Sequence, residues 1–512
     1  MFVSVQNSGS TALVIGLTLI ICSISAAERN DAERSDAEDG TWSFRWLQQR
    51  AEDLATRPFV RSASVPEQLQ QLDYDRYRRI GFRPEKAIWR DSQAPFWLEG
   101  FHRGYLFGDR VILHLVENGH VQRVPFDRQL FRYPSDFEHL SVPHDLGFAG
   151  FRVLGRFARS PHPLEIASFL GTSYFRAIGE GQVYGTSARG LAIDIGLTKA
   201  EEFPEFREFW VERPEPAARE LRIGALMDSP SVTGAYEFVL RPGAATIWEV
   251  TARLFFRRVP EKIGLAPLSS MWMWGDGRPG PRDDPRPKVH DADGLLVWTN
   301  DGEWVWRPLS QPGYPSLSQY EFGGIRGFGL MQRDRRHESY RDDRVEYHLR
   351  PSVWIEPLHD WSAGAVELLE LPAKHEGVDS IAAWWTPREP IRIDQPLDLH
   401  YTVSFMPSEP QQHVEARAVA TRVVRRSGQP LTVEIEFAGR QLAAFAADAA
   451  IVPEVQCLRG KVTHVQCRRQ PDGNWQVRFD VHPTEPAPIE LRAVLKTEGR
   501  SVSESWRYLC PI

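Results

Sequence analysis

The stretch YEFVLRPGAATIWEVTARLF (residues 236–255) decides the fold class. Apolar and polar residues alternate along 236–240 and again along 246–255, and a Pro-Gly cluster separates the two runs. A period of two residues is typical of a β-strand with one buried face, and Pro-Gly clusters mark turns. The stretch therefore predicts two neighbouring antiparallel strands.

The same alternation returns elsewhere in the chain, at 111–116 and at 400–405. Between residues 210 and 410 no sustained run has apolar residues at helical spacing. Short alternating runs separated by Gly and Pro clusters are typical of a many-stranded β-sandwich. We therefore expect an all-β fold over most of the chain.

Helices are predicted only near the start of the chain. Phe44, Leu47, Ala51 and Leu54 lie at helical spacing within residues 41–56. A second helix is predicted to begin at Pro66, because proline is favoured in the first turn of a helix.

The C-terminal part predicts a second, smaller sandwich. A chain of 512 residues exceeds the size at which one core keeps growing, so we expect two domains. Proline and polar residues predict a linker at 409–415, and short strands follow it at 414–424, 431–437, 462–467, 475–481 and 489–495. About a hundred residues of such strands indicate an immunoglobulin-like domain. The predicted division is a signal peptide at 1–27, a large domain at 28–408, the linker at 409–415 and the small domain at 416–512.

The apolar stretch TALVIGLTLIICSISAA (residues 11–27) predicts an export signal cleaved after Ala27, because it is short for a membrane span and ends in small residues. Residues 1–10 contain no Lys or Arg, which keeps an uncleaved anchor as an alternative and excludes a twin-arginine signal. An exported chain with Cys457, Cys467 and Cys510 is expected to form one disulfide. Cys457 with Cys467 is the local choice, and Cys510 competes.

Composition and motifs exclude several kinds of function. Acidic and basic residues are mixed along the chain, with a net charge of −7, so no nucleic-acid partner is expected. The sequence contains no HExxH, CxxC, GxSxG or phosphate-binding loop, and its histidines lack metal-ligand spacing. We therefore predict no metal and no organic cofactor.

Carboxylates and aromatic rings remain, and these are the side chains that glycoside hydrolysis uses. Two segments combine them, VHDADGLLVWTNDGEWVWRPL (289–309) and HEGVDSIAAWWTP (375–387). Asp291 and Asp293 precede Gly294, a pattern that a simple turn also explains. Asp379 precedes an apolar strand in which Trp384 and Trp385 point to opposite faces, so only one of these rings can line a groove.

Long stretches of the chain resemble the periplasmic osmoregulated glucan biosynthesis proteins G and D. They are ASFLGTSYFRAIGEGQVYGTSARGLAID (167–194), GLAPLSSMWMWG (264–275), RPKVHDADGL (286–295), GEWVWRPL (302–309), GFGLMQR (327–333) and YHLRPSVW (347–354). The resemblance implies a large galactose-mutarotase-like β-sandwich joined to an immunoglobulin-like β-sandwich.

The resemblance also implies an anomer-inverting endo-β-1,2-glucanase, with Asp379 as general acid and Asp291 as general base. Tyr347 is the first candidate for orienting substrate or relaying a proton, and packing between sheets is the alternative. The candidate substrate-binding residues are Tyr347, Arg350, Trp306 and Trp384. We expect burial beside Trp384 or Trp385 to raise the pKa of Asp379, and we expect Asp291 to stay ionised.

The implied setting is the periplasm, with β-1,2-glucan as the ligand, a membrane glucosyltransferase as a candidate partner and a homodimer as a candidate assembly. After VATRVVRRSG (419–428) the chain lacks a longer loop that D-type proteins carry, which favours a G-like protein, as does the missing twin arginine. Two alternatives stay open: a transglycosylase that forms branched or cyclised glucan, and a non-catalytic glucan-binding or assembly factor.

Overall fold

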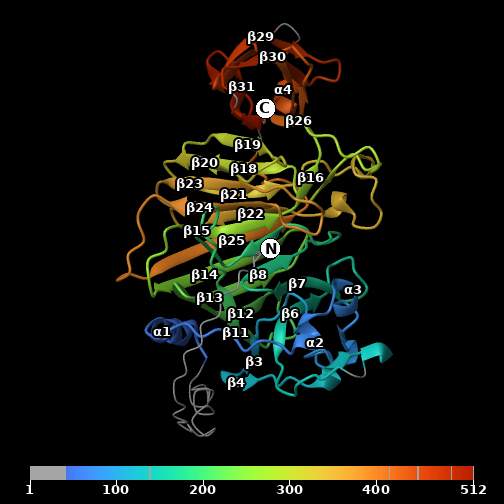
Figure 1. The fold of residues 1–512 in the computed structure, drawn as a ribbon, viewed down its shortest axis with the longest axis vertical. Coiled ribbons are helices and arrows are strands. Elements are labelled where there is room, and N and C mark those ends of the chain that lie inside the picture. Colours follow the sequence, from blue (N-terminus) through green and yellow to red (C-terminus); the bar gives the residue numbers. More distant parts are fainter. Residues whose placement is uncertain (1–41, 138–139, 414–415, 447–448, 486, 511–512) are drawn as a thin grey trace, which may run out of the picture.

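The computed structural model describes residues 42–137, 140–413, 416–446, 449–485 and 487–510. These residues form a large β-sandwich and a smaller one stacked on its end along the long axis of the molecule (Figure 1). The predicted all-β class is confirmed. The predicted signal peptide lies outside the described residues, and no helix within them is long and apolar enough to cross a membrane.

The strands predicted from residues 236–255 form as expected. They are β13 (Val232–Arg241) and β14 (Thr246–Phe256), which pair antiparallel with Phe238 opposite Val250. The side chains of β14 are alternately buried and half-exposed, as the period of two requires.

These strands belong to the longer of the two main sheets. Its order is β28-β31-β33-β19-β18-β21-β22-β25-β14-β13-β12-β11-β3-β4, and β32 pairs with β31. The other strands of the large sandwich in this sheet are β3 (Ile112–Glu117), β4 (His120–Arg123), β11 (Glu205–Glu212), β12 (Leu221–Asp228), β18 (Gly294–Thr299), β19 (Trp304–Pro308), β21 (Ile325–Met331), β22 (Ser352–Pro357) and β25 (Leu397–Met406).

A second sheet faces the first, in the order β2-β6-β7-β8-β9-β15-β24-β23-β20, with β10 paired to β15. Its strands are β2 (Phe96–His102), β6 (Phe148–Gly155), β7 (Leu164–Leu170), β8 (Tyr174–Ala177), β9 (Ser187–Arg189), β10 (Leu191–Ile193), β15 (Ile263–Ser270), β20 (Ser316–Phe322), β23 (Gly364–Glu370) and β24 (Ile381–Pro387). Two short ribbons complete the large sandwich: β1 (Gly81–Phe82) with β5 (Phe131–Arg132), and β16 (Trp272–Trp274) with β17 (Val289–His290).

Large aromatic side chains fill the space between the two sheets. Phe169 on β7 contacts Phe238 on β13 and Trp248 on β14, with ring centroids 5.1 and 5.4 Å apart. Rings of this size bury much apolar surface, which is the main term that stabilises such a core. Many of the chain's 17 Trp, 27 Phe and 13 Tyr residues therefore serve packing.

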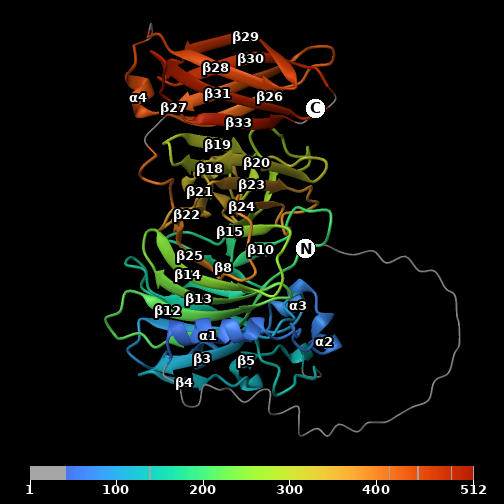
Figure 2. The same ribbon diagram turned by 90° about the vertical axis from the view of Figure 1, so that its left-hand side faces the viewer.

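The first predicted helix is α1 (Phe44–Ala55), which buries Leu47 and Ala51 against β12, β13 and β14 (Figure 2). The Ser43 hydroxyl caps it by accepting a hydrogen bond from the backbone N–H of Trp46. The second predicted helix is one short turn. The remaining helices are α2 (Glu67–Gln70), α3 (Tyr74–Tyr77), α4 (Arg440–Ala444) and the 3-10 turns η3 (Pro84–Lys86), η4 (Arg128–Leu130), η5 (Ser135–Phe137), η6 (His337–Ser339) and η7 (Tyr347–Leu349).

The smaller sandwich packs two sheets around its own core. One sheet has the order β26-β27-β30-β29, and the other is the end of the long sheet, which begins with β28. The strands are β26 (Arg417–Val424), β27 (Leu431–Ala438), β28 (Val452–Leu458), β29 (Gly460–Arg469), β30 (Trp475–Pro483), β31 (Ile489–Thr497), β32 (Arg500–Ser501) and β33 (Ser505–Cys510). Sequence reasoning missed β28, β32 and β33.

The junction between the sandwiches is continuous and buried. β33 pairs in parallel with β19, so that Trp506 lies opposite Trp306 and one sheet runs through both sandwiches. Glu409 and His413, within the predicted linker 409–415, are 6% and 3% exposed. The described part of this segment is therefore packed into the junction, and the division at 409–415 remains an interpretation.

The predicted local disulfide does not form in the structure. Cys457 on β28 and Cys467 on β29 are free thiols. The two strands belong to different sheets of the small sandwich. Proximity in sequence therefore did not place the two sulfur atoms in bonding geometry.

Candidate functional site

Asp291 occupies a buried position at the end of the β17 strand. Its side chain is almost fully enclosed, and its backbone N–H donates to the carbonyl of Met271 at 2.9 Å. The Arg350 guanidinium donates to the Asp291 carboxylate. Burial raises the pKa of Asp291 to about 6, although the charge of Arg350 opposes this shift; the charge of Asp379 raises it further.

Asp379 lies on the loop that joins β23 to β24, and its side chain is exposed. The next residue, Ser380, is buried, and its hydroxyl both accepts from the backbone N–H and donates to the carbonyl of Trp272, each at 3.2 Å. Met271 and Trp272 are adjacent in the chain, so one dipeptide holds the segments of both candidate carboxylates.

The expected surroundings of the two carboxylates are reversed. The prediction placed Asp379 in partial burial beside Trp384 or Trp385 and left Asp291 in a polar turn. Asp379 is instead exposed, because it ends a surface loop, and Asp291 is the carboxylate that burial affects. Arg350, rather than turn groups, supplies the charge that favours ionised Asp291.

Tyr347 and Arg350 connect the two carboxylate segments. The Arg350 guanidinium lies 4.4 Å from the centroid of the Tyr347 ring, a distance suited to cation–π attraction. The Tyr347 hydroxyl donates to Glu376, which is on the same loop as Asp379. Burial, reinforced by this bond, raises the pKa of Tyr347, so the phenol keeps its proton at neutral pH.

Two predicted substrate-binding rings are buried. Trp384 is 0% exposed and packs in a small apolar cluster with Ala192 and Ile195. Trp306 is 3% exposed at the junction of the sandwiches, where the Arg333 guanidinium lies 3.4 Å from its ring centroid. A ring without an exposed face cannot stack on a sugar, so neither is retained in the candidate site. Alternation along a strand could not reveal that both faces of β24 are covered.

Basic side chains from the second sheet surround the carboxylates, and sequence reasoning did not select them. The charge of Arg176 lowers the pKa of Asp291, against the larger effect of burial. Arg189 pairs with Glu201 at 2.5 Å and is close enough to Asp379 for that charge to act on it. Both arginines lie within residues 167–194, one of the stretches that resemble the family. That resemblance is the signal that could have identified them as site residues.

Arg286 makes further contacts with the β23–β24 loop, which carries Glu376 and Asp379. Its guanidinium contacts Glu376 at 3.0 Å and Asp342 at 2.8 Å, and it also pairs with Asp284. Within the described ranges, no group of three or more His, Cys, Asp or Glu side chains is arranged to hold a metal ion. The site therefore consists of a buried carboxylate, an exposed carboxylate and several arginines.

The fold and this site define the class: an all-β protein of two stacked sandwiches whose polar site pairs a buried with an exposed carboxylate. The family model described as "Periplasmic glucan biosynthesis protein, MdoG" matches residues 42–510. The chain belongs to this family.

Relatives of both named types are similar to the chain. It is 43% identical to glucans biosynthesis protein D 1 of Ralstonia nicotianae, over 90% of each chain. It is 40% identical to glucans biosynthesis protein G of Rhodopseudomonas palustris, over 93% of this chain and 94% of the relative. It is 38% identical to the probable glucans biosynthesis protein D of Shewanella oneidensis, over 97% of this chain and 94% of the relative. These similar values do not separate the two types, so a G-like character remains a prediction.

Proposed function

We propose that residues 1–27 export this protein to the periplasm, where it cleaves β-1,2-glucan internally with inversion of the anomeric centre. The observation that carries the proposal is the pair Asp291 and Asp379, whose segments are held together by Met271 and Trp272. Membership of a glucan biosynthesis family supports glucan as the substrate class. A membrane glucosyltransferase is the proposed source of the polymer.

In this mechanism Asp379 protonates the glycosidic oxygen and Asp291 removes a proton from the attacking water. Exposure lets Asp379 reach a polymer that approaches from solvent. Arg350 orients the Asp291 carboxylate and helps to keep it ionised. Tyr347, whose hydroxyl faces the loop of the acid, orients the substrate or relays a proton.

Product analysis separates this function from its alternatives. The full-length protein is incubated with linear β-1,2-glucan, and the products are resolved by chromatography and mass spectrometry. Shorter linear chains are expected. Branched or cyclised products would instead identify a transglycosylase, and a polymer that is bound but unchanged would identify a non-catalytic assembly factor.

The rate of cleavage is expected to fall as the pH falls below about 6, because the base must be ionised and burial raises the pKa of Asp291 to about 6. Below that value, kcat/KM should fall about tenfold for each pH unit. The pH profile of kcat/KM measures this directly. A profile that stays flat well below the pKa of Asp291 would exclude this residue as the base.

The variant Arg350→Ala is expected to move the acidic limb of the profile, the fall of kcat/KM at low pH, to higher pH. The Arg350 charge lowers the pKa of Asp291, so its removal leaves burial and Asp379 to raise the pKa further. Arg350→Lys is the matched control, because it retains the positive charge and should leave the limb nearer its original position. An unshifted limb in Arg350→Ala would contradict the role given to this ion pair.

A further inference from the structure

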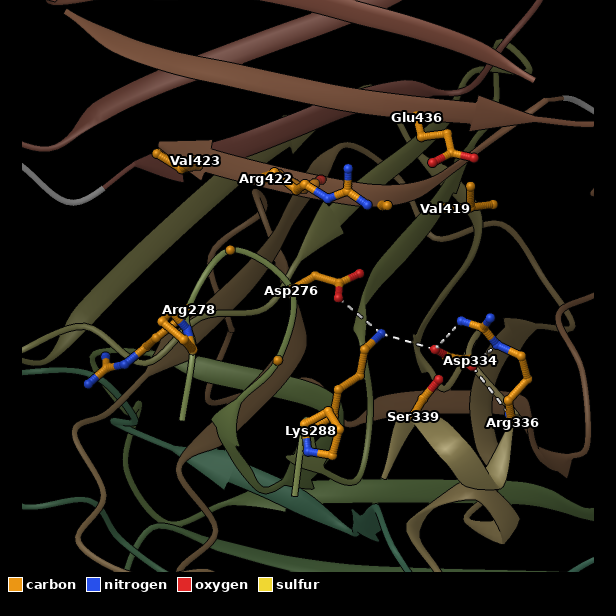
Figure 3. A pocket seen from close by; sticks show the side chains of 16 residues that line it. Asp276, Arg278, Lys288, Asp334, Arg336, Ser339, Val419, Arg422, Val423 and Glu436 are labelled. Atoms are coloured by element: carbon orange, nitrogen blue, oxygen red, sulfur yellow. Dashed lines mark hydrogen bonds and ion pairs between the residues drawn. The ribbon is translucent and has the colours of Figure 1, made fainter. Parts of the chain in front are cut away.

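A cavity of 780 Å³ lies between the two sandwiches (Figure 3). The large sandwich contributes the turn after β16, the two residues before β17 and the segment around η6. The small sandwich contributes β26 and one residue of β27. Its polar lining includes Asp276, Lys288, Arg336, Ser339, Arg422 and Glu436. Known ligand sites have volumes of about 300–1,000 Å³, so the cavity is large enough for a small organic ligand.

The charges that line this cavity largely balance. The Lys288 ammonium lies 3.1 Å from carboxylate oxygens of both Asp276 and Asp334, and Arg336 pairs with Asp334 at 3.1 Å. Arg278 adds a positive charge, and Arg422 and Glu436 add one charge of each sign on the opposite wall (Figure 3). Among the described residues, four cationic and three anionic side chains therefore line the cavity. An ionic ligand would therefore meet like charges as well as opposite ones. The lining favours a neutral ligand that can both donate and accept hydrogen bonds.

The wall formed by the small sandwich includes the edge of a sheet. β26 is an edge strand of its sheet, and its residues 419–423 line the cavity. An edge strand presents backbone N–H and C=O groups along one side. Val419 and Val423 add apolar surface beside them. Backbone groups, a guanidinium fork and carboxylates beside small apolar surfaces match the vicinal hydroxyls and C–H faces of a sugar.

We propose that this cavity is a second carbohydrate-binding site, which takes a segment of neutral glucan apart from the Asp291–Asp379 site. The identity of the sugar rests on the proposed function, whereas the existence of the site rests on the cavity itself.

The two sites are built from neighbouring residues of the large sandwich. Lys288, His290 and Asp293 line a smaller cavity of 40 Å³ that adjoins the first. Asp291, between them, instead bonds Arg350 beside Tyr347. Glucan in the cavity would therefore contact the segment that carries the candidate base.

Calorimetric titration of the full-length Asp291→Asn variant with linear β-1,2-glucan oligosaccharides tests this site, because cleavage is blocked during the measurement. We expect two binding events. Adding Arg422→Ala should weaken one of them about tenfold, the effect of losing a charged hydrogen bond. Arg468→Ala is the matched control, since it removes an exposed arginine from β29, the other edge of the same sheet, and should change neither event.

A second pair of variants fills the cavity instead of removing a donor. Val419→Trp adds bulk inside it, and Val465→Trp adds the same bulk on β29 at a position with nearly equal exposure, 44% against 42%. Only the first should abolish the second binding event.

Each outcome separates this inference from the proposed function. One binding event, insensitive to Arg422→Ala and Val419→Trp but weakened by Arg350→Ala, would overturn the second site and leave the proposed function standing. One event that only the cavity variants remove would support the second site and count against the Asp291–Asp379 site as a glucan site. An absence of binding in every variant would overturn both.

Discussion

Replacing Asp379 by asparagine is expected to slow glucan cleavage by about 10²–10⁴-fold, the contribution of a positioned general acid. Asparagine keeps the size of the side chain but has no carboxylic proton to give to the leaving oxygen. Because Asp379 is exposed on a loop, the substitution should leave the fold intact. Initial rates of product release from linear β-1,2-glucan measure the loss, and a thermal melt checks the fold.

Asp360→Asn is the matched control for this experiment. Asp360 is also an exposed loop aspartate, and it precedes β23 as Asp379 follows it. We expect its activity to equal that of the unmodified protein. If Asp379→Asn retains the full rate while its melting temperature is unchanged, Asp379 is not the acid.

Replacing Arg333 by methionine is expected to cost about 3–5 kcal/mol of the free energy of unfolding, the usual effect of leaving buried charges unpaired. Arg333 bonds Glu409 at 2.5 Å and Glu504 at 2.7 and 2.8 Å. Glu504 is 0% exposed, and both carboxylates also contact the buried His413. The variant therefore leaves two buried carboxylates at the junction without their main cation.

Urea unfolding followed by tryptophan fluorescence measures this loss, because Trp306 lies directly under the Arg333 guanidinium. Arg336→Met is the matched control: the Arg336 side chain is 77% exposed, and its partner Asp334 keeps a second cation, Lys288, at 3.1 Å. Removing an exposed cation of this kind costs little. Equal midpoints for the two variants would contradict the role of the junction.

The same junction predicts a loss of stability in acid. Burial alone would raise the pKa of Glu409, but the charges of Arg333, His413 and Arg417 lower it to about 2. Because the pKa of Glu409 is lower in the folded than in the unfolded chain, its ionised carboxylate stabilises the fold at every pH above the unfolded value. This part of the free energy of unfolding is lost as the pH falls towards about 2.

Local patterns predicted the elements of the fold better than their connections. The alternation at 236–255 predicted β13 and β14, and helical spacing predicted α1, because each pattern follows from one buried face. The parallel pairing of β33 with β19 joins residues about two hundred positions apart. No local pattern carries such a contact, so the continuous junction was not predicted.

Residue types at the site were easier to predict than their burial. Turns beside aromatic strands selected the two segments, and the family resemblance chose Asp291 and Asp379 within them. The structure holds these segments together. Burial depends on what packs above a residue, which explains why Trp384 and Trp306 were misplaced. Arg176 and Arg189 were missed because a lone arginine on a strand has no distinctive spacing.

The anomeric form of the first product tests the central claim most directly. The full-length protein is mixed with linear β-1,2-glucan, and proton NMR spectra are recorded as the products form. These spectra distinguish the α and β anomers of the new reducing ends before the anomers equilibrate in water. An inverting acid–base pair predicts that each newly formed reducing end is first α. Initial release of the β anomer, or no new reducing end at all, would contradict the assignment of Asp379 and Asp291 as an inverting pair.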